Sequence, residues 1–257
     1  MTPADGATRM VTAVAKSGHR RGQSYVPPED VAATTLEDLL GGLRSISADQ
    51  QQRLALGPAV DQQPSVRLWV AGDTALVRRP CVAIVGTREV TEAGAARARR
   101  LAKELAQAGV VVVSGLAKGV DTEALQCAIE NGGKTIAVIG TPLDTAYPAE
   151  NKRLQETIYR EHLLVSQFPQ GSRVFPGNFP QRNKVMAAIT DATVIMEASD
   201  TSGTLHQAAE CQRLGRWLFI AHAVVSDKAL TWPAKFLGHP RARVLTDSRD
   251  LLAVLTA

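Results

Sequence analysis

Short apolar runs alternate with amphipathic segments along most of the chain. The apolar runs are rich in valine, isoleucine and leucine, and their length and β-branched content predict β-strands. These runs lie at residues 81–86, 110–115, 135–140, 163–168, 192–197 and 217–222. An alternating apolar and polar segment at 65–73 predicts an earlier strand.

Helices are predicted between these strands, because alanine and leucine recur there at helical spacing and glycine or proline marks several ends. They cover 91–109, 121–133, 148–162, 181–190 and 204–215, and a final small strand and helix fit residues 242–255. Strands that are apolar on both faces and alternate with helices indicate an α/β fold with a parallel sheet covered on both sides. Ligands of such sheets bind beyond the carboxyl ends of the strands.

The N-terminal part of the chain follows a different pattern. Residues 1–27 lack apolar periodicity and are expected to form a disordered tail. Amphipathic stretches within 28–63 predict a small helical segment, and the regular α/β pattern occupies residues 64–257. The start of the chain also lacks the apolar core of a signal peptide.

Composition narrows the class of protein. The chain has 257 residues, of which 45% are hydrophobic, and 29 basic against 25 acidic residues give a net charge of +4. This balance is compatible with an anionic partner without requiring one. No apolar run approaches the roughly 20 residues of a membrane span, so a cytoplasmic protein is expected. The three cysteines are scattered beside apolar residues, which predicts reduced buried thiols and neither disulfides nor a metal site: Cys81, Cys127 and Cys211.

Small, hydroxyl and basic residues follow several predicted strands. Glycine lets a backbone approach a ligand closely, and helix N-termini bind anions. The sequence therefore predicts a phosphate site along one edge of the sheet, although glycines in such loops also serve tight turns. The candidate residues are Gly86, Thr87 and Arg88, then Ser114, Gly115 and Lys118, and finally Ser202, Gly203 and Thr204.

A long irregular loop at 166–185 holds three prolines and two glycines, together with basic and aromatic residues. Cations that follow a phosphate backbone and rings that stack on bases are typical of single-stranded nucleic acid binding. Arg182, Asn183 and Lys184 begin a helix, where side chains and backbone both favour phosphate. Alternatively, Phe168 and Phe179 pin the loop to the core.

Signals for catalysis are few. The sequence has neither G-x-G-x-x-G nor the Walker lysine motif nor G-x-S-x-G, and no cofactor is expected. Asp121, which opens a predicted helix, is interpreted as a helix cap. Glu197 ends a predicted strand, where it could orient a basic residue, bind a sugar hydroxyl or act as a base.

Six separated segments resemble the DNA-processing protein A (DprA/Smf) family in order and spacing. They include "VAIVGTREV", "VVVVSGLAKGVDTEAL", "TAYPAEN", "LLVSQFPQG", "NFPQRNKVMAAITDATVIMEASDTSGT" and "AAECQRLGRWLFIAH". The likeness runs from about residue 66 to 222. It implies an extended Rossmann-like domain with a doubly wound, mostly parallel sheet. It also implies single-stranded DNA binding, loading of the RecA recombinase, homodimers, and a role in natural transformation and recombination.

The same resemblance places the family's phosphate-binding positions on the residues named above, from Gly86 to Lys184, with residues 202–204 as a second small-residue loop. The chain departs from the family pattern at Leu125 and Gln167, and the "SGSxxTA" segment reads "SGTLHQAAE". No C-terminal winged helix is expected after residue 257.

A second function stays open at this point. Relatives in the wider superfamily cleave the N-glycosidic bond of nucleotides, and "DTSGTLHQAAE" is a loose analogue of their loop. In that case the protein would be a nucleotide-binding or nucleotide-cleaving sensor, with Glu197 or Glu210 as the acid, and a role in phage defence would be conceivable. A third alternative is a scaffold that acts through partners and no longer uses its anion site.

Overall fold

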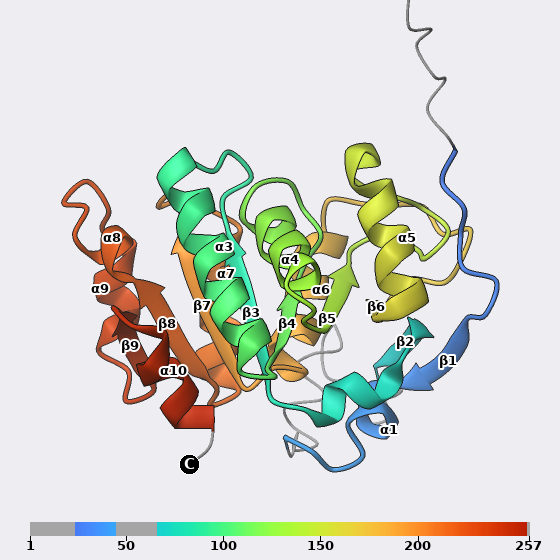
Figure 1. Cartoon of the computed structure of the whole chain (residues 1–257), viewed down its shortest axis with the longest axis horizontal. Coiled ribbons are helices and arrows are strands. Elements are labelled where there is room, and N and C mark those ends of the chain that lie inside the picture. The colour runs from blue at the N-terminus through green and yellow to red at the C-terminus, as the bar shows by residue number, and fades with distance from the viewer. Residues whose placement is uncertain (1–23, 45–65, 256–257) are drawn as a thin grey trace, which may run out of the picture.

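The computed structural model describes residues 24–44 and 66–255. Nine strands form one mixed sheet in the order β1-β2-β6-β5-β4-β3-β7-β8-β9 (Figure 1). All neighbours from β6 to β9 are parallel, whereas β1 and β2 pair antiparallel at one edge. The predicted α/β fold with a mostly parallel sheet is therefore confirmed. The strands are β1 Ala32–Thr35, β2 Arg67–Gly72, β3 Cys81–Gly86, β4 Val111–Ser114, β5 Thr135–Ile139, β6 Leu163–Ser166, β7 Ala192–Glu197, β8 Trp217–Ala221 and β9 Ala242–Leu245.

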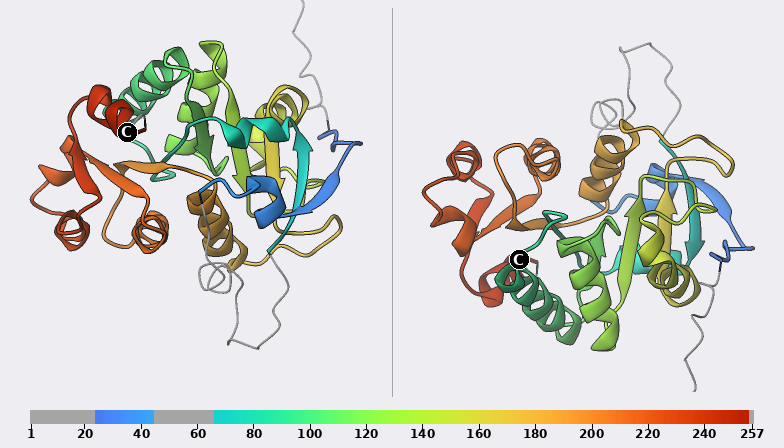
Figure 2. Two further views of the ribbon diagram at one scale, coloured as in Figure 1. Left: turned by 90° about the horizontal axis from the view of Figure 1, so that it is seen from below. Right: turned by 90° about the horizontal axis from the view of Figure 1, so that it is seen from above.

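Helices cover both faces of the sheet. In Figure 2, α3, α4, α5 and α10 lie on one face, and α6, α7 and α9 lie on the other. The longer helices are α3 Glu92–Gln107, α4 Val120–Glu130, α5 Lys152–Glu161, α6 Asn178–Ala188, α7 Thr204–Arg213 and α10 Ser248–Leu255. Short helical turns are α1 Leu36–Leu40, η1 Thr74–Arg78, η2 Ala149–Asn151, α8 His222–Val225 and α9 Trp232–Leu237.

The core strands are buried on both faces, as their continuous apolar runs predict. Every residue of β4 and β5 is buried, and so are the first five residues of β3. Burial of this apolar surface is the main favourable term in folding. The direction of winding reverses between β3 and β7, because β4, β5 and β6 extend the sheet to one side and β7, β8 and β9 extend it to the other.

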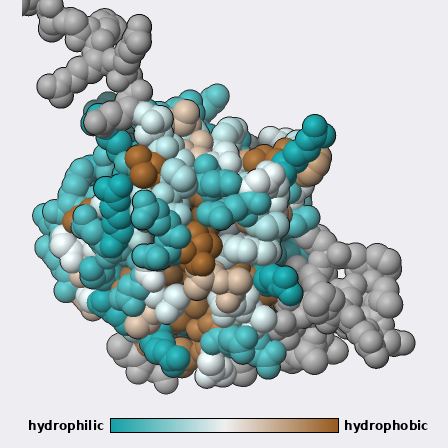
Figure 3. Space-filling view, turned by 90° about the vertical axis from the view of Figure 1, so that its right-hand side faces the viewer, coloured by the Kyte–Doolittle hydropathy of each residue, from teal (hydrophilic) through white to brown (hydrophobic). Residues whose placement is uncertain are grey.

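The described part of the N-terminal segment, residues 24–44, is less helical than expected. Residues 32–35 form an edge strand, and only α1 is helical before residue 44. Residues 24–27, expected to belong to the tail, contact α5: Gln155 Nε2 donates to the Tyr25 hydroxyl at 2.9 Å, and the Tyr159 hydroxyl donates to Val26 O at 2.8 Å. The predicted boundary near residue 64 and the part of the predicted helical segment from 45 to 63 lie outside the described residues. Seen from the side of β1 and α5, the surface is mainly hydrophilic, with apolar patches between the polar groups (Figure 3).

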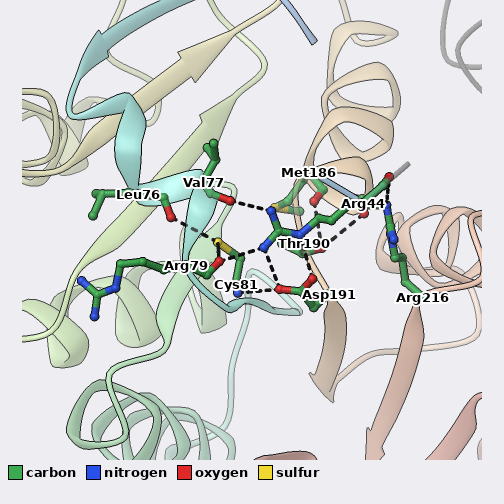
Figure 4. Close-up of polar contacts among 10 residues, drawn as sticks. Arg44, Leu76, Val77, Arg79, Cys81, Met186, Thr190, Asp191 and Arg216 are labelled. Carbon is green, nitrogen blue, oxygen red and sulfur yellow. Dashed lines mark hydrogen bonds and ion pairs between the residues drawn. The ribbon is translucent and has the colours of Figure 1, made fainter. Parts of the chain in front are cut away.

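Arg44 fastens this segment to the edge of the sheet where the parallel strands begin (Figure 4). Its Nε and Nη2 donate to the two carboxylate oxygens of Asp191 at 2.8 and 2.7 Å. Asp191 Oδ2 also accepts from the Cys81 amide at 2.8 Å. Burial raises the pKa of the Cys81 thiol to about 12, although the charge of Arg44 opposes the rise. The three cysteines are buried, as expected.

Candidate nucleic-acid interface

A cavity of about 320 Å³ opens where the strand order reverses, beyond the carboxyl ends of β3 and β7. Such a reversal is the usual ligand position in doubly wound sheets. We call this opening the β3–β7 cavity. Its walls are residues 85–89, the loop before α4, the first half of α6 and the segment from Ser199 to Gln207. It brings together these predicted phosphate residues: Gly86, Thr87, Arg88, Arg182, Asn183, Ser202, Gly203 and Thr204.

The turn after β3 needs glycine for close packing. A Cβ atom on Gly86 would lie 2.5 Å from Cγ2 of Val120 and 2.8 Å from the carbonyl oxygen of Glu197. The register between β3 and β7 shifts at this residue, so the Thr87 amide donates to Glu197 O at 2.7 Å. The Thr87 amide is therefore not available to a ligand. Its hydroxyl accepts from the Glu89 amide at 3.2 Å and keeps a proton to donate.

A cation and two aromatic rings lie beside the cavity. The guanidinium carbon of Arg88 is 5.7 Å from the centre of the Phe179 ring, and the Tyr147 ring centre is 5.6 Å from that of Phe179. Together with Gly115 and Lys118 they border a crevice of about 70 Å³, which shares Arg88, Phe179 and Arg182 with the β3–β7 cavity. Phe179 is half-buried and packs where a Cβ on Gly140 would lie, 2.7 Å from Cδ1.

The loop between β4 and α4 is held by side chains from three elements. The Asp121 carboxylate accepts from the amides of Gly115 and Ala117 at 3.1 and 3.3 Å. Asn151 Nδ2 donates to Leu116 O at 2.9 Å, and Leu116 has a left-handed φ of 59°. Asp121 therefore does not cap α4, whose N-cap is Gly119; it uses the loop amides that were expected to bind phosphate.

Arg182 completes this clamp from the other face of the sheet. It is 6% exposed, and its Nη1 donates to the carbonyl oxygens of Gly115 and, at 2.8 Å, of Val138. Burial lowers the pKa of Arg182, and the nearby charge of Asp121 opposes that shift. For Asp121, burial raises the pKa and the charge of Arg182 opposes the rise. Arg182 thus holds the loop in place, and the same guanidinium group fills part of the cavity wall.

Three other predicted residues lie away from the cavity. Ser114 is fully buried, and its hydroxyl donates to Ile84 O at 2.7 Å, so it supports the sheet. Lys184 lines neither the cavity nor the crevice. Lys118 is exposed at the crevice and forms an ion pair with Glu150.

The cavity wall from Ala198 to Gly203 is hydrogen-bonded to the start of α9, and the sequence patterns did not indicate these contacts. The Asp200 carboxylate accepts from the amides of Thr231 and Trp232, the latter at 2.8 Å. The Trp232 indole is fully buried and donates to Ala198 O at 3.0 Å. These bonds fix the wall although its own residues are mostly exposed.

Neither acid proposed for nucleotide cleavage lines the β3–β7 cavity. Glu197 accepts from the Thr91 hydroxyl at 2.8 Å, at the start of α3, and lies 3.8 Å from Arg97. Glu210 is paired with Arg213. Both carboxylates therefore bind other residues of the chain, and the carboxylates that do line the cavity belong to Glu89 and Asp121.

A family model described as DNA recombination-mediator protein A matches residues 52–256. The chain belongs to this family. A DNA processing protein DprA from Streptococcus pneumoniae is 38% identical over 188 residues, covering 73% of this chain and 66% of the relative. A Smf protein from Synechocystis is 41% identical over 178 residues, covering 69% of this chain and 44% of the relative. The matched segments thus span less than two thirds of either relative.

Solved structures of DprA proteins share the fold. The Streptococcus pneumoniae structure has a TM-score of 0.73 at 33% identity and covers 88% of this chain and 74% of that one. A Helicobacter pylori structure, described for its single-stranded DNA binding mode, has a TM-score of 0.67 at 29% identity and covers 79% of this chain and 93% of that one. The predicted resemblance and the Rossmann-like architecture are confirmed by these matches.

Two further properties concern residues 24–44 and 66–255. No helix among them has the length and apolar content needed to cross a bilayer. Nor do these residues gather three or more His, Cys, Asp or Glu side chains in a group that could hold a metal ion.

Proposed function

We propose that this protein binds single-stranded DNA along the edge of the sheet formed by the β3–β7 cavity and the neighbouring crevice. The observation that carries the proposal is the placement of the Arg88 guanidinium 5.7 Å from the Phe179 ring centre, between the cavity and Lys118. Cations beside an aromatic ring suit a strand whose phosphates need charge and whose bases stack. The relative from Helicobacter pylori, described as binding single-stranded DNA, supports the same proposal.

The DNA strand would lie over the exposed residues at the mouths of the cavity and the crevice, Arg88 and Lys118, and only a short part of it would enter the cavity. Arg88 is exposed to phosphate oxygens, and Lys118 is exposed although it is paired with Glu150, whereas Arg182 is engaged with carbonyl groups. The hydroxyl of Thr87 and the small residues 202–204 let a backbone approach the opposite wall. Binding is the proposed activity, because the two candidate acids for cleavage hold structural contacts instead.

The wider role follows from family membership. We propose that the protein acts on single-stranded DNA in transformation and recombination, works as a homodimer and helps to load RecA. Assembly of RecA on oligonucleotides coated with single-strand binding protein, with and without this protein, measures the loading step. An unchanged assembly rate in the presence of a DNA-binding preparation would contradict it.

A salt series tests DNA binding itself. Fluorescence anisotropy with a labelled 20-mer of thymidine should show affinity that falls steeply with salt, because counterions are released from the strand. Arg88→Ala should weaken binding about tenfold and reduce the slope by about 0.7, the contribution of one phosphate on a single strand. Phe179→Ala should weaken binding about 5- to 100-fold with little change in slope, as expected for a lost stacking contact.

Arg78→Ala is the matched control for Arg88→Ala. Arg78 is exposed and ends η1 at the opposite edge of the sheet, so the same change of charge should leave affinity nearly unchanged. Equal affinities for the parent protein and Arg88→Ala at low salt would contradict the proposed site.

A further inference from the structure

The floor of the β3–β7 cavity contains a hydrogen-bond acceptor without a partner. Gln207, in α7, lines the cavity and is fully buried. Its Nε2 lies 3.2 Å from the Thr193 hydroxyl of β7, and among the described residues nothing donates to its Oε1. Buried acceptors are nearly always paired in folded proteins. This oxygen is therefore suited to a donor that a ligand supplies.

The other groups of the cavity show which part of a ligand reaches the floor. Val85 and Met186 line it and are almost completely buried, so its depth has apolar surfaces beside the buried polar side chains of Asp121, Arg182, Thr204 and Gln207. The cation Arg88 stands at the exposed rim. An ionised phosphate offers only acceptors and would repel Gln207 Oε1. A nucleobase, with apolar faces and N–H groups on its edge, fits the floor, while its phosphate fits the rim.

The size of the cavity limits how much of the strand can enter. Small-molecule sites range from about 300 to 1,000 Å³, and the β3–β7 cavity, at about 320 Å³, lies at the lower end. It therefore suits one nucleotide unit. The flanking nucleotides would remain outside, along Arg88 and Phe179.

We propose that the β3–β7 cavity takes one base turned out of the bound strand, and that Gln207 Oε1 accepts a hydrogen bond from the imino N–H of that base. Thymine N3–H and guanine N1–H are donors of this kind, whereas the ring nitrogens at the same edge of cytosine and adenine are acceptors. This inference rests on the proposed binding of single-stranded DNA.

The test compares two oligonucleotides, one of which has this donor replaced by a methyl group. One is a labelled 12-mer of thymidine, and the other has every thymine methylated at N3. The unmodified strand should bind about 3- to 10-fold more tightly to the parent protein, the range expected for one hydrogen bond. Gln207→Met has a similar length without an acceptor, and it should bind both strands equally and about as tightly as the parent protein binds the methylated one.

Two further variants keep the result interpretable. Gln207→Thr keeps a polar group on a shorter side chain and should also lose the preference. Gln126→Met changes an exposed glutamine of α4 and should retain it. Free thymidine monophosphate at the concentration of the 12-mer should not displace the strand, since it lacks the flanking phosphates. Displacement at equal concentration would overturn the assignment to a base within a strand.

The outcomes separate this inference from the proposed function. If the parent protein binds both strands equally while Arg88→Ala still weakens binding, the role of Gln207 is overturned and DNA binding stands. If Gln207→Met and Gln207→Thr both keep the preference for the unmethylated strand, the selection is also not made by Gln207. If the parent protein binds neither strand at low salt, both proposals fail.

Discussion

The guanidinium group of Arg182 occupies the space that a side chain on Gly115 would need. A Cβ atom on Gly115 would lie 1.9 Å from Arg182 Nη1 and 2.3 Å from its Cζ. The two residues come from opposite faces of the sheet, from the loop before α4 and from α6. The clamp on the 115–117 loop therefore depends on the absence of a side chain at residue 115.

Gly115→Ala should therefore destabilise the protein by about 2–4 kcal/mol, because the added methyl group displaces a buried, hydrogen-bonded guanidinium. Urea denaturation at constant slope measures the change in free energy of unfolding. Gly238→Ala is the control, since a Cβ there meets no atom within 4 Å, and it should change stability by less than about 0.5 kcal/mol. Equal stability of the two variants would show that Arg182 can move without cost.

Removing the acid that pairs with Lys118 should strengthen DNA binding. Lys118 and Glu150 form an exposed ion pair at the crevice, so Glu150 competes with any phosphate for the same ammonium group. Glu150→Gln should raise affinity for a 20-mer of thymidine about two- to fivefold at low salt, and the gain should shrink as salt rises. The measurement is fluorescence anisotropy at two ionic strengths.

Glu161→Gln is the matched control for Glu150→Gln, with the same change in net charge. Glu161 ends α5 next to the start of β6, at the edge of the sheet opposite the crevice. It should have a smaller effect than Glu150→Gln. An equal gain from both variants would assign the effect to net charge, not to the release of Lys118.

The contact between Arg44 and Asp191 should be important for stability. Arg44→Met removes a side chain that is only 7% exposed and leaves the Asp191 carboxylate without its bidentate partner. A loss of about 1–3 kcal/mol in the free energy of unfolding is expected, because the buried contacts of Arg44 are lost while the Asp191 carboxylate, 31% exposed, keeps partial access to water. Asp191→Asn should lower the free energy of unfolding less in the Arg44→Met variant than in the parent protein, and a double-mutant cycle measures this difference.

The control for Arg44→Met is Arg249→Met, which breaks a bidentate pair between Arg249 and Asp247 at the surface. Exposed pairs contribute little to stability, so this variant should unfold at nearly the same urea concentration as the parent. If Arg44→Met were equally harmless, the N-terminal segment would be held by other contacts.

Lowering the pH should reduce the free energy of unfolding, because His162 is buried in the folded state. Its side chain is 4% exposed, and burial, with a smaller contribution from Lys134, lowers its pKa below the unfolded value of about 6.5. The unfolded chain thus takes up a proton more readily. The contribution to stability is complete above about pH 6.5 and is lost as the pH falls from there through the lowered pKa of the folded state.

His162→Leu should therefore lose less stability than the parent protein between pH 7.5 and 5.5, measured by urea denaturation at each pH. His206→Leu changes an exposed histidine of α7 and should follow the parent. Parallel losses in all three proteins would assign the acid sensitivity to other groups.

The central strands could be predicted because burial on both faces leaves a continuous apolar run in the sequence. Most helices could be predicted because alanine and leucine recur in them at helical spacing. The predicted strand at 81–86 coincides with β3, and the one at 192–197 coincides with β7. β1 could not be predicted from "AATT", because a four-residue edge strand has neither an apolar run nor clear alternation. Its existence depends on pairing with β2, which is a tertiary contact.

The candidate site was predictable in its position but not in the role of each residue. Eight predicted phosphate residues line one cavity, because loops after parallel strands meet at one edge of the sheet. Sequence gives no sign that the Arg182 side chain turns inward to two carbonyl groups, or that Asp121 takes two amides of the preceding loop. These contacts depend on how α6 and α4 pack across the sheet. The lack of a hydrogen-bond donor for Gln207 Oε1 likewise depends on the packing of α7 and cannot be predicted from the sequence.

The reversal of strand order between β3 and β7 also determines when the cavity forms during synthesis. One wall follows β3 and the opposite wall follows β7, with the whole of β4, β5 and β6 made in between. A nascent chain that has exposed every residue up to Ile189 already contains Arg88, Lys118 and Phe179 but not the wall from Ser199 to Gln207. The hydrogen bonds that hold that wall require Trp232 as well. On the ribosome, the basic rim is therefore made well before the pocket that would select a base.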